Sequence, residues 1–87
     1  MEKQAIKELR QKAKLIDPII RIGKNGFSES TIIQIKQLLK KRKLIKIKFL
    51  KSFLEDNDKK KAAEELCSKT GAELIDKIGF IVVIYRR

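Results

Sequence analysis

The apolar run FIVVIY, at residues 80–85, is the feature that most limits how this chain can fold. Side chains of a strand alternate between its two faces, so this run places apolar side chains on both faces. Such a strand is stable where both faces are covered, as in the middle of a packed sheet. We therefore expect a central strand here. The run is too short for a membrane-spanning helix, which needs about 20 apolar residues.

A second strand pattern, LIKIKFLK at residues 44–51, differs because its apolar residues alternate with lysines. Ile45, Ile47 and Phe49 share one face, and the lysines between them share the other. This alternation predicts a strand with one buried face and one polar face.

Periodicity and capping signals divide the rest of the chain. Asp17 precedes a proline, which disfavours helical backbone and ends the first helix. Ser28 can cap the second helix and Asn57 or Asp58 the third, which Gly71 closes. The predicted elements are helices at 3–16, 28–41 and between 58 and 71, and strands at 18–22, 44–51, 72–78 and 80–85.

The order of these elements is α-β-α-β-α-β-β, which predicts an α/β fold. We expect a single compact domain over residues 1–87, with a mixed four-stranded sheet packed with helices. Gly79 separates the last two strands, which predicts a hairpin.

Charge is distributed unevenly along the chain. Lys and Arg number 22 against 11 Asp and Glu, a net charge of +11. Residues 1–26 hold seven basic and three acidic groups, residues 27–51 eight and one, and residues 52–87 seven of each. The excess is therefore confined to the first 51 residues. General solubility would explain the abundance of lysine, but the asymmetry favours a polyanionic partner such as a nucleic acid.

The basic part of the chain contains a glycine-bracketed turn in PIIRIGKNGFSES, between a predicted strand and a predicted helix. Gly23 and Gly26 allow a tight turn and a close approach of another molecule to the backbone. Amides at the start of a helix favour a phosphate, and Lys24 adds a positive charge. The alternative is a plain tight turn in which the glycines serve geometry alone.

Polar and basic side chains also recur at helical spacing on the first two helices, which predicts one polar stripe on each. With the turn, the stripes would form a continuous surface that contacts phosphates more than bases. The alternative for each is an ordinary solvated face. The residues are Lys3, Lys7, Arg10 and Lys14 on the first helix, and Ser30, Gln34, Gln37 and Lys41, with Lys40 beside them, on the second.

Residue types needed for catalysis are scarce. The chain has no His, which removes the commonest general base and metal ligand. Its one cysteine, Cys67, lies on an apolar helix stripe, where a packing role is expected. The acidic run at 55–58 lacks the spacing of a calcium loop and suits a helix-capping turn. We therefore expect no enzyme activity, no cofactor and no metal site, and a cytoplasmic protein without membrane contact.

These segments together resemble the CRM domain family (chloroplast RNA splicing and ribosome maturation), in particular its stand-alone YhbY-like members. The likeness spans nearly the whole chain: the basic first helix, PIIRIGKNGFSES, LIKIKFL and TGAELIDKIGFIVVIYR. Its most specific parts are IGKNG before a helix, and IG before a final apolar strand that ends in Tyr85 and Arg86.

The resemblance implies an RNA-binding domain with a fold similar to the C-terminal domain of bacterial initiation factor three. It further implies ribosomal RNA or pre-ribosomal particles as partners, during assembly of the large ribosomal subunit, and possible ribosomal or assembly proteins. The family's GxxG loop, which is likened to that of KH domains, falls on Gly23, Lys24, Asn25 and Gly26.

Two other functions remain open from the residues alone. A small basic protein that shapes DNA would carry the same charge, since phosphate contacts dominate binding to both nucleic acids. A protein-binding adaptor could instead use a sheet edge or the face with Lys46 and Lys48. The oligomeric state is also left open.

Overall fold

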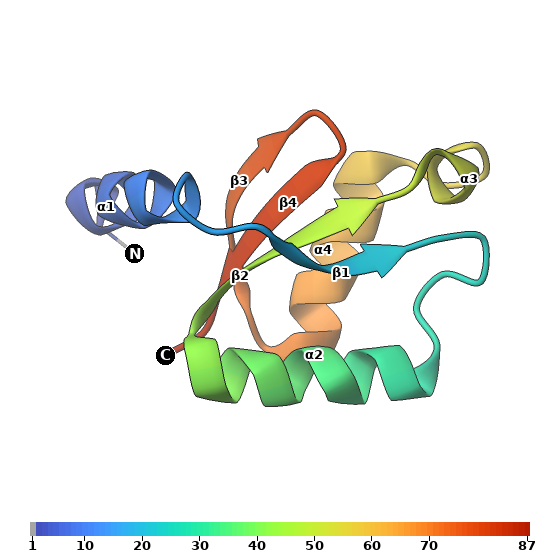
Figure 1. Cartoon of the computed structure of the whole chain (residues 1–87), viewed down its shortest axis with the longest axis horizontal. Helices are drawn as coiled ribbons and strands as arrows, with labels where there is room; N and C mark the ends of the chain where they lie inside the picture. Colours follow the sequence, from blue (N-terminus) through green and yellow to red (C-terminus); the bar gives the residue numbers. More distant parts are fainter. Residues whose placement is uncertain (1) are drawn as a thin grey trace.

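The structure, a computed structural model, describes residues 2–87 and shows a sheet with helices on both of its faces (Figure 1). Its longest helix has 14 residues, and none of the helices in residues 2–87 is long and apolar enough to cross a membrane. The elements in chain order are α1 (Lys3–Ala13), β1 (Pro18–Ile22), α2 (Glu29–Arg42), β2 (Leu44–Phe49), α3 (Lys51–Leu54), α4 (Lys59–Thr70), β3 (Glu73–Ile78) and β4 (Ile81–Tyr85).

The four strands form one mixed sheet in the order β1-β2-β4-β3. β1 and β2 are parallel and are connected by α2, whereas β4 is antiparallel to both of its neighbours. The predicted central position of β4 is confirmed, and Val82, Val83 and Ile84 are fully buried. β3 and β4 form the predicted hairpin, with Gly79 at positive φ in a two-residue turn.

The larger core lies between the sheet and the helices α2 and α4. Alternation along β2 places Ile45, Ile47 and Phe49 in this core, as predicted. Ile35 and Leu39 fill it from α2, together with Leu66 and other residues of α4. The apolar stripe of α2 therefore faces the sheet, which leaves its opposite stripe to solvent.

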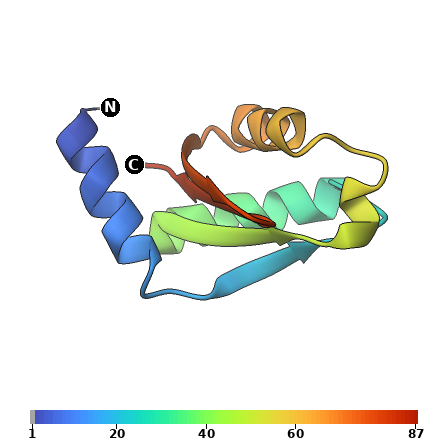
Figure 2. The same ribbon diagram turned by 90° about the horizontal axis from the view of Figure 1, so that it is seen from above.

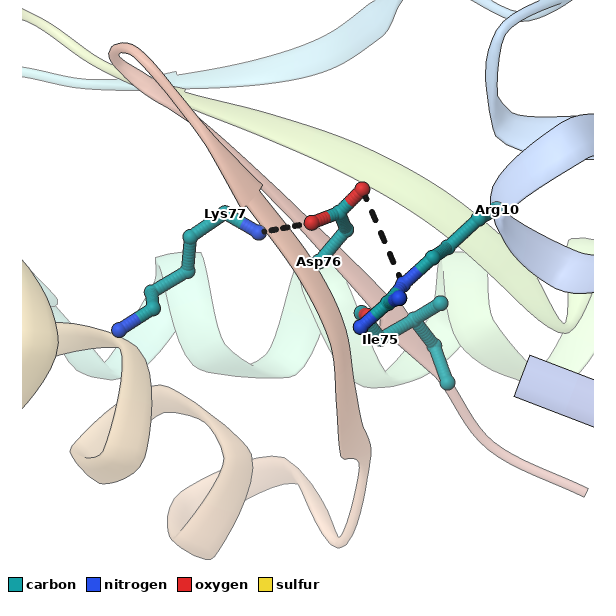
Figure 3. A network of polar contacts seen from close by, with 4 residues as sticks. All are labelled: Arg10, Ile75, Asp76 and Lys77. Carbon is teal, nitrogen blue, oxygen red and sulfur yellow. Dashed lines mark hydrogen bonds and ion pairs between the residues drawn. The ribbon is translucent and has the colours of Figure 1, made fainter. Parts of the chain in front are cut away.

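A smaller core lies on the other face of the sheet, under α1. Ala13 packs there against Ile75 and Val83. Arg10 fixes the helix to β3, because its Nε donates to the Ile75 carbonyl oxygen at 3.0 Å and lies 3.9 Å from an Asp76 carboxylate oxygen (Figure 3). The register of β3 shifts between Leu74 and Asp76, where Leu74 packs on the larger core and Ile75, on the opposite face of the strand, packs under α1.

Two predicted element boundaries are wrong, and one short helix was not predicted. The first helix ends at Ala13 rather than near residue 16, because the next three amides bond to carbonyls three residues back in a tighter turn. The second strand ends at Phe49 rather than residue 51, and the short helix α3 follows it. Four residues are too few to show a helical period, and the burial of Phe53 holds α3 against the core.

The predicted helix caps are confirmed. The Ser28 hydroxyl accepts from the Thr31 amide at 3.2 Å at the start of α2. Of the two candidates for the cap of α4, it is Asp58 whose carboxylate accepts from the Lys61 amide. Gly71 closes α4 in the left-handed conformation, with φ +72°.

The sheet core gives a matched test of packing. We expect Ile47→Ala to lower the free energy of unfolding by about 2–5 kcal/mol, because it opens a cavity at a fully buried position. Ile33→Ala removes the same atoms from an α2 position that is 50% exposed and should change stability much less. Urea denaturation of both variants measures the difference, and equal losses would contradict this packing.

Candidate nucleic-acid interface

The glycine turn, residues Gly23–Gly26, connects the end of β1 to the segment that leads into α2. The Gly26 amide donates to the Gly23 carbonyl oxygen at 2.9 Å, which closes a four-residue turn with Lys24 and Asn25 at its exposed tip. Within residues 2–87, neither the Lys24 amide nor the Asn25 amide donates to a protein acceptor. Two backbone donors and two polar side chains are therefore presented together to solvent.

The two glycines of the turn differ in their backbone conformation. Gly26 has φ +64°, a conformation that costs an ordinary residue roughly 1–2 kcal/mol. Gly23 does not have such a conformation, and a Cβ at this position would make only an ordinary contact, 3.4 Å from Leu50 Cδ1 just before α3. The backbone of the turn therefore requires glycine at Gly26, whatever its function, but not at Gly23.

Three phenylalanine rings pack against one another next to the turn. Phe27, which directly follows it, has its ring centroid 5.5 Å from that of Phe53 and 6.2 Å from that of Phe49. The rings of Phe49 and Phe53 are 5.0 Å apart. Because these rings join the end of β2, α3 and the turn, the turn rests on the core, and Phe27 is a packing residue.

The second helix continues the polar surface that starts at the turn. All five predicted residues of its stripe, Ser30, Gln34, Gln37, Lys40 and Lys41, are exposed. The stripe lies opposite Ile35 and Leu39, which face the core. The structure thus brings the glycine turn and the α2 stripe together as one surface, with the turn at the N-terminal end of the helix (Figure 1).

The predicted continuity with the first helix is wrong. Lys7 and Arg10 belong to α1 and Lys14 is its C-cap, and α1 packs on the face of the sheet opposite α2. α1 also lies at the start of β1, whereas the turn follows its end, and five strand residues span about 16 Å. Figure 2 shows α1 at one end of the molecule, away from the turn. Arg10, moreover, is held by β3.

The positive charges of the interface are not neutralised by neighbouring carboxylates. The ion pairs that the structure shows within residues 2–87 are Arg10–Asp76 and Lys69–Glu65. Neither involves the turn or α2, where Glu29 is the one acidic residue. Glu29 lies in the first turn of the helix, where it interacts favourably with the helix dipole.

The structure shows Cys67 half-buried against the core. Burial, and to a lesser extent the charge of Glu73, raises the pKa of its thiol from 9.0 to about 11. The thiol is therefore protonated near neutral pH and is a poor nucleophile. Among residues 2–87, no three His, Cys, Asp or Glu side chains are grouped so that they could hold a metal ion.

The sequence profile of the CRS1 / YhbY (CRM) domain family matches residues 1–86. The chain belongs to the CRM domain family. A Staphylococcus aureus protein with a known solution structure is 42% identical and superposes with a TM-score of 0.81, over 100% of this chain and 88% of that one. The expected fold is thereby confirmed at the level of a CRM-type α/β domain.

Two curated relatives of this CRM domain carry the name "probable RNA-binding protein". One, from Methanocaldococcus jannaschii, is 37% identical over 78 residues, which are 90% of this chain and 58% of the relative. The other, from Bacillus subtilis, is also 37% identical over 78 residues, which are 90% of this chain and 79% of the relative. The chain therefore spans little more than half the length of the archaeal relative.

Four basic residues near the α2 stripe were not predicted as part of a site. They line a hollow together with Gln37 and Lys40, and they are Lys36, Lys43, Arg86 and Arg87. No local motif marks them, because the two arginines lie more than 40 residues from the helix in sequence. Only the pairing of β2 with β4 brings the two segments together.

The thiol of Cys67 gives a pH test. We expect its alkylation by iodoacetamide in the folded protein to keep accelerating up to about pH 11. In urea, the rate should level off near pH 9.0, the ordinary thiol value. Because the folded pKa is the higher one, this group's contribution to stability is complete below pH 9 and is lost as the pH rises toward 11. Identical rate profiles in both states would contradict the burial.

Proposed function

We propose that this chain binds structured ribosomal RNA during assembly of the large ribosomal subunit. The surface that contacts RNA is the glycine turn together with the exposed stripe of α2. The observation that carries the proposal is the position of the turn: it presents two unpaired backbone amides beside Lys24, at the head of a helix with a polar and basic outer stripe.

The turn is suited to hold the sugar–phosphate backbone rather than a base. Within residues 2–87 the Lys24 and Asn25 amides have no protein acceptor, so both can donate to a phosphate oxygen. Lys24 and Asn25 add a positive charge and hydrogen-bonding groups at the tip. This arrangement is similar to the GxxG loop of KH domains, which clamps backbone nucleotides.

The α2 stripe extends the contact with RNA along the axis of the helix. Gln34 and Gln37 supply hydrogen bonds, and Lys40 and Lys41 supply positive charge. The helix spans about 21 Å over its 14 residues, so the stripe is long enough to follow several nucleotides. The basic residues of α1 are left out of this interface because they lie on the other face of the sheet.

Membership of the CRM domain family supports RNA as the polyanion. The names of two relatives describe RNA-binding proteins, and each matches 90% of this chain. The family profile matches residues 1–86, and this range includes the glycine turn. The ribosomal target is proposed on the resemblance to stand-alone YhbY-like proteins.

A salt series separates RNA from DNA as the partner. We expect a structured ribosomal RNA fragment to bind about tenfold more tightly, or ~1.4 kcal/mol, than a DNA duplex of equal length at physiological salt. Both affinities should fall as salt rises, because counterions are released from each nucleic acid. Fluorescence anisotropy measures both. Equal or tighter binding of the duplex would favour a DNA-shaping protein instead.

A charge reversal at the tip tests the turn itself. We expect Lys24→Glu to weaken RNA binding by about tenfold or more, because it places a negative charge beside the bound phosphate. Lys60→Glu makes the same change on the exposed surface of α4 and should have a much smaller effect. Thermal unfolding of both variants confirms that the fold is retained. Equal losses of affinity would mean that the turn has no specific role.

A further inference from the structure

A hollow lined almost entirely by positive charge lies at the opposite end of α2 from the glycine turn. It has a volume of about 480 Å³, and we refer to it as the C-terminal hollow. Figure 1 shows the end of the chain beside the end of α2, where the hollow is formed. The lining residues are Lys36, Gln37, Lys40, Lys43, Arg86 and Arg87.

The backbone fixes the segments that form this hollow. Leu44 and Tyr85 are paired in the sheet, so the residues next to them, Lys43 and Arg86, are neighbours. The Arg86 amide donates to the Lys43 carbonyl oxygen at 2.9 Å. The Arg86 guanidinium donates to the Thr70 carbonyl oxygen at 3.3 Å, at the end of α4. One wall of the hollow is therefore held by the sheet and by a second helix.

The side chains that line the hollow carry an excess of positive charge. Five of the six lining residues are cations, and none of the ion pairs seen within residues 2–87 involves them. The carbonyl ends of α2 and α4 are close, and each is equivalent to about half a negative charge. These two ends together offset about one of the five positive charges, so an anion would be strongly attracted.

The backbone of Lys43, which lines the hollow, has an unusual conformation. It has φ +66° and ψ −45°, and it is the one residue other than glycine with positive φ in residues 2–87. This conformation lies outside the left-handed αL region in which helices commonly end, and a residue with a Cβ rarely adopts it. A lysine here costs stability, and backbone outliers of this kind are concentrated at functional sites.

We propose that the C-terminal hollow binds a phosphate group of the RNA backbone, as a second contact about 21 Å along α2 from the glycine turn. This inference rests on the proposed function and extends it. Gln37 and Lys40 belong to both the hollow and the α2 stripe, so one RNA strand can run continuously from the turn to the hollow.

The lining favours RNA over a protein partner. No apolar side chain lines the hollow, whereas the centre of a protein interface is apolar and poor in charge. Two arginines are present, and the planar guanidinium group matches the oxygens of a phosphate in a bidentate way. The proposed ligand is thus a phosphodiester, held by several cations at once.

Lys43→Gly is the decisive variant, because it removes a cation and relieves backbone strain together. We expect it to leave the melting temperature equal or higher, yet to weaken RNA binding by about fivefold. The slope of log K against log salt should also fall by about 0.7–1, as for one lost phosphate contact. Lys60→Gln, an exposed lysine on α4, is the control for loss of charge alone.

Two results of this experiment would overturn the proposal. One is an unchanged affinity and salt slope for Lys43→Gly. The other is an equal change for Lys60→Gln, which would show that only the net charge matters. Because Lys43→Gly should not destabilise the fold, weaker binding cannot be attributed to unfolding. A second variant, Lys36→Gln with Arg87→Gln, should lower the affinity and the slope further.

A titration with inorganic pyrophosphate separates failure of this site from failure of the proposed function. We expect the backbone amide signals of residues 36–43 and 86–87 to shift in NMR spectra, and the shifts to weaken in Lys43→Gly. If the wild-type protein does not bind RNA but these shifts occur, the proposed function fails while the anion site stands. If RNA binds and these signals do not move with pyrophosphate, the site is wrong.

Discussion

Burial of β4 on both faces is the constraint on which the rest of this structure depends. Val82 and Ile84 require cover from α2 and α4, and Val83 requires cover from α1. A strand with apolar side chains on both faces is unstable at an edge or on an open face. The helices are therefore divided between the two faces, with the larger core on the side of α2 and α4.

This division also decides where the positive charge can act. The stripe of α2 points away from the core, and the glycine turn and the C-terminal hollow lie at its two ends. The basic residues of α1 are separated from this surface by the sheet itself. A chain with charge spread over its first 51 residues thus presents one linear basic surface and a distinct basic helix.

Much of the fold was predictable because its signals are local. Ser28, Asp58 and Gly71 act through hydrogen bonds and backbone conformations within a few residues of themselves, and all three have their predicted roles. The short α3 was not predictable, since burial of Phe53 rather than any helical period defines it. The register shift in β3 between Leu74 and Asp76 was likewise not predicted.

The sequence by itself determined the α/β class, the central place of β4 and the glycine turn with the polar stripe of α2. Each of these features is encoded within a short segment, by the alternation of a strand, the spacing of a helix or the presence of glycine. Only the tertiary structure decided which basic residues lie together. It separated Arg10 from the turn and brought Arg86 to Lys43, because strand pairing and the sides that helices cover join residues far apart in the chain.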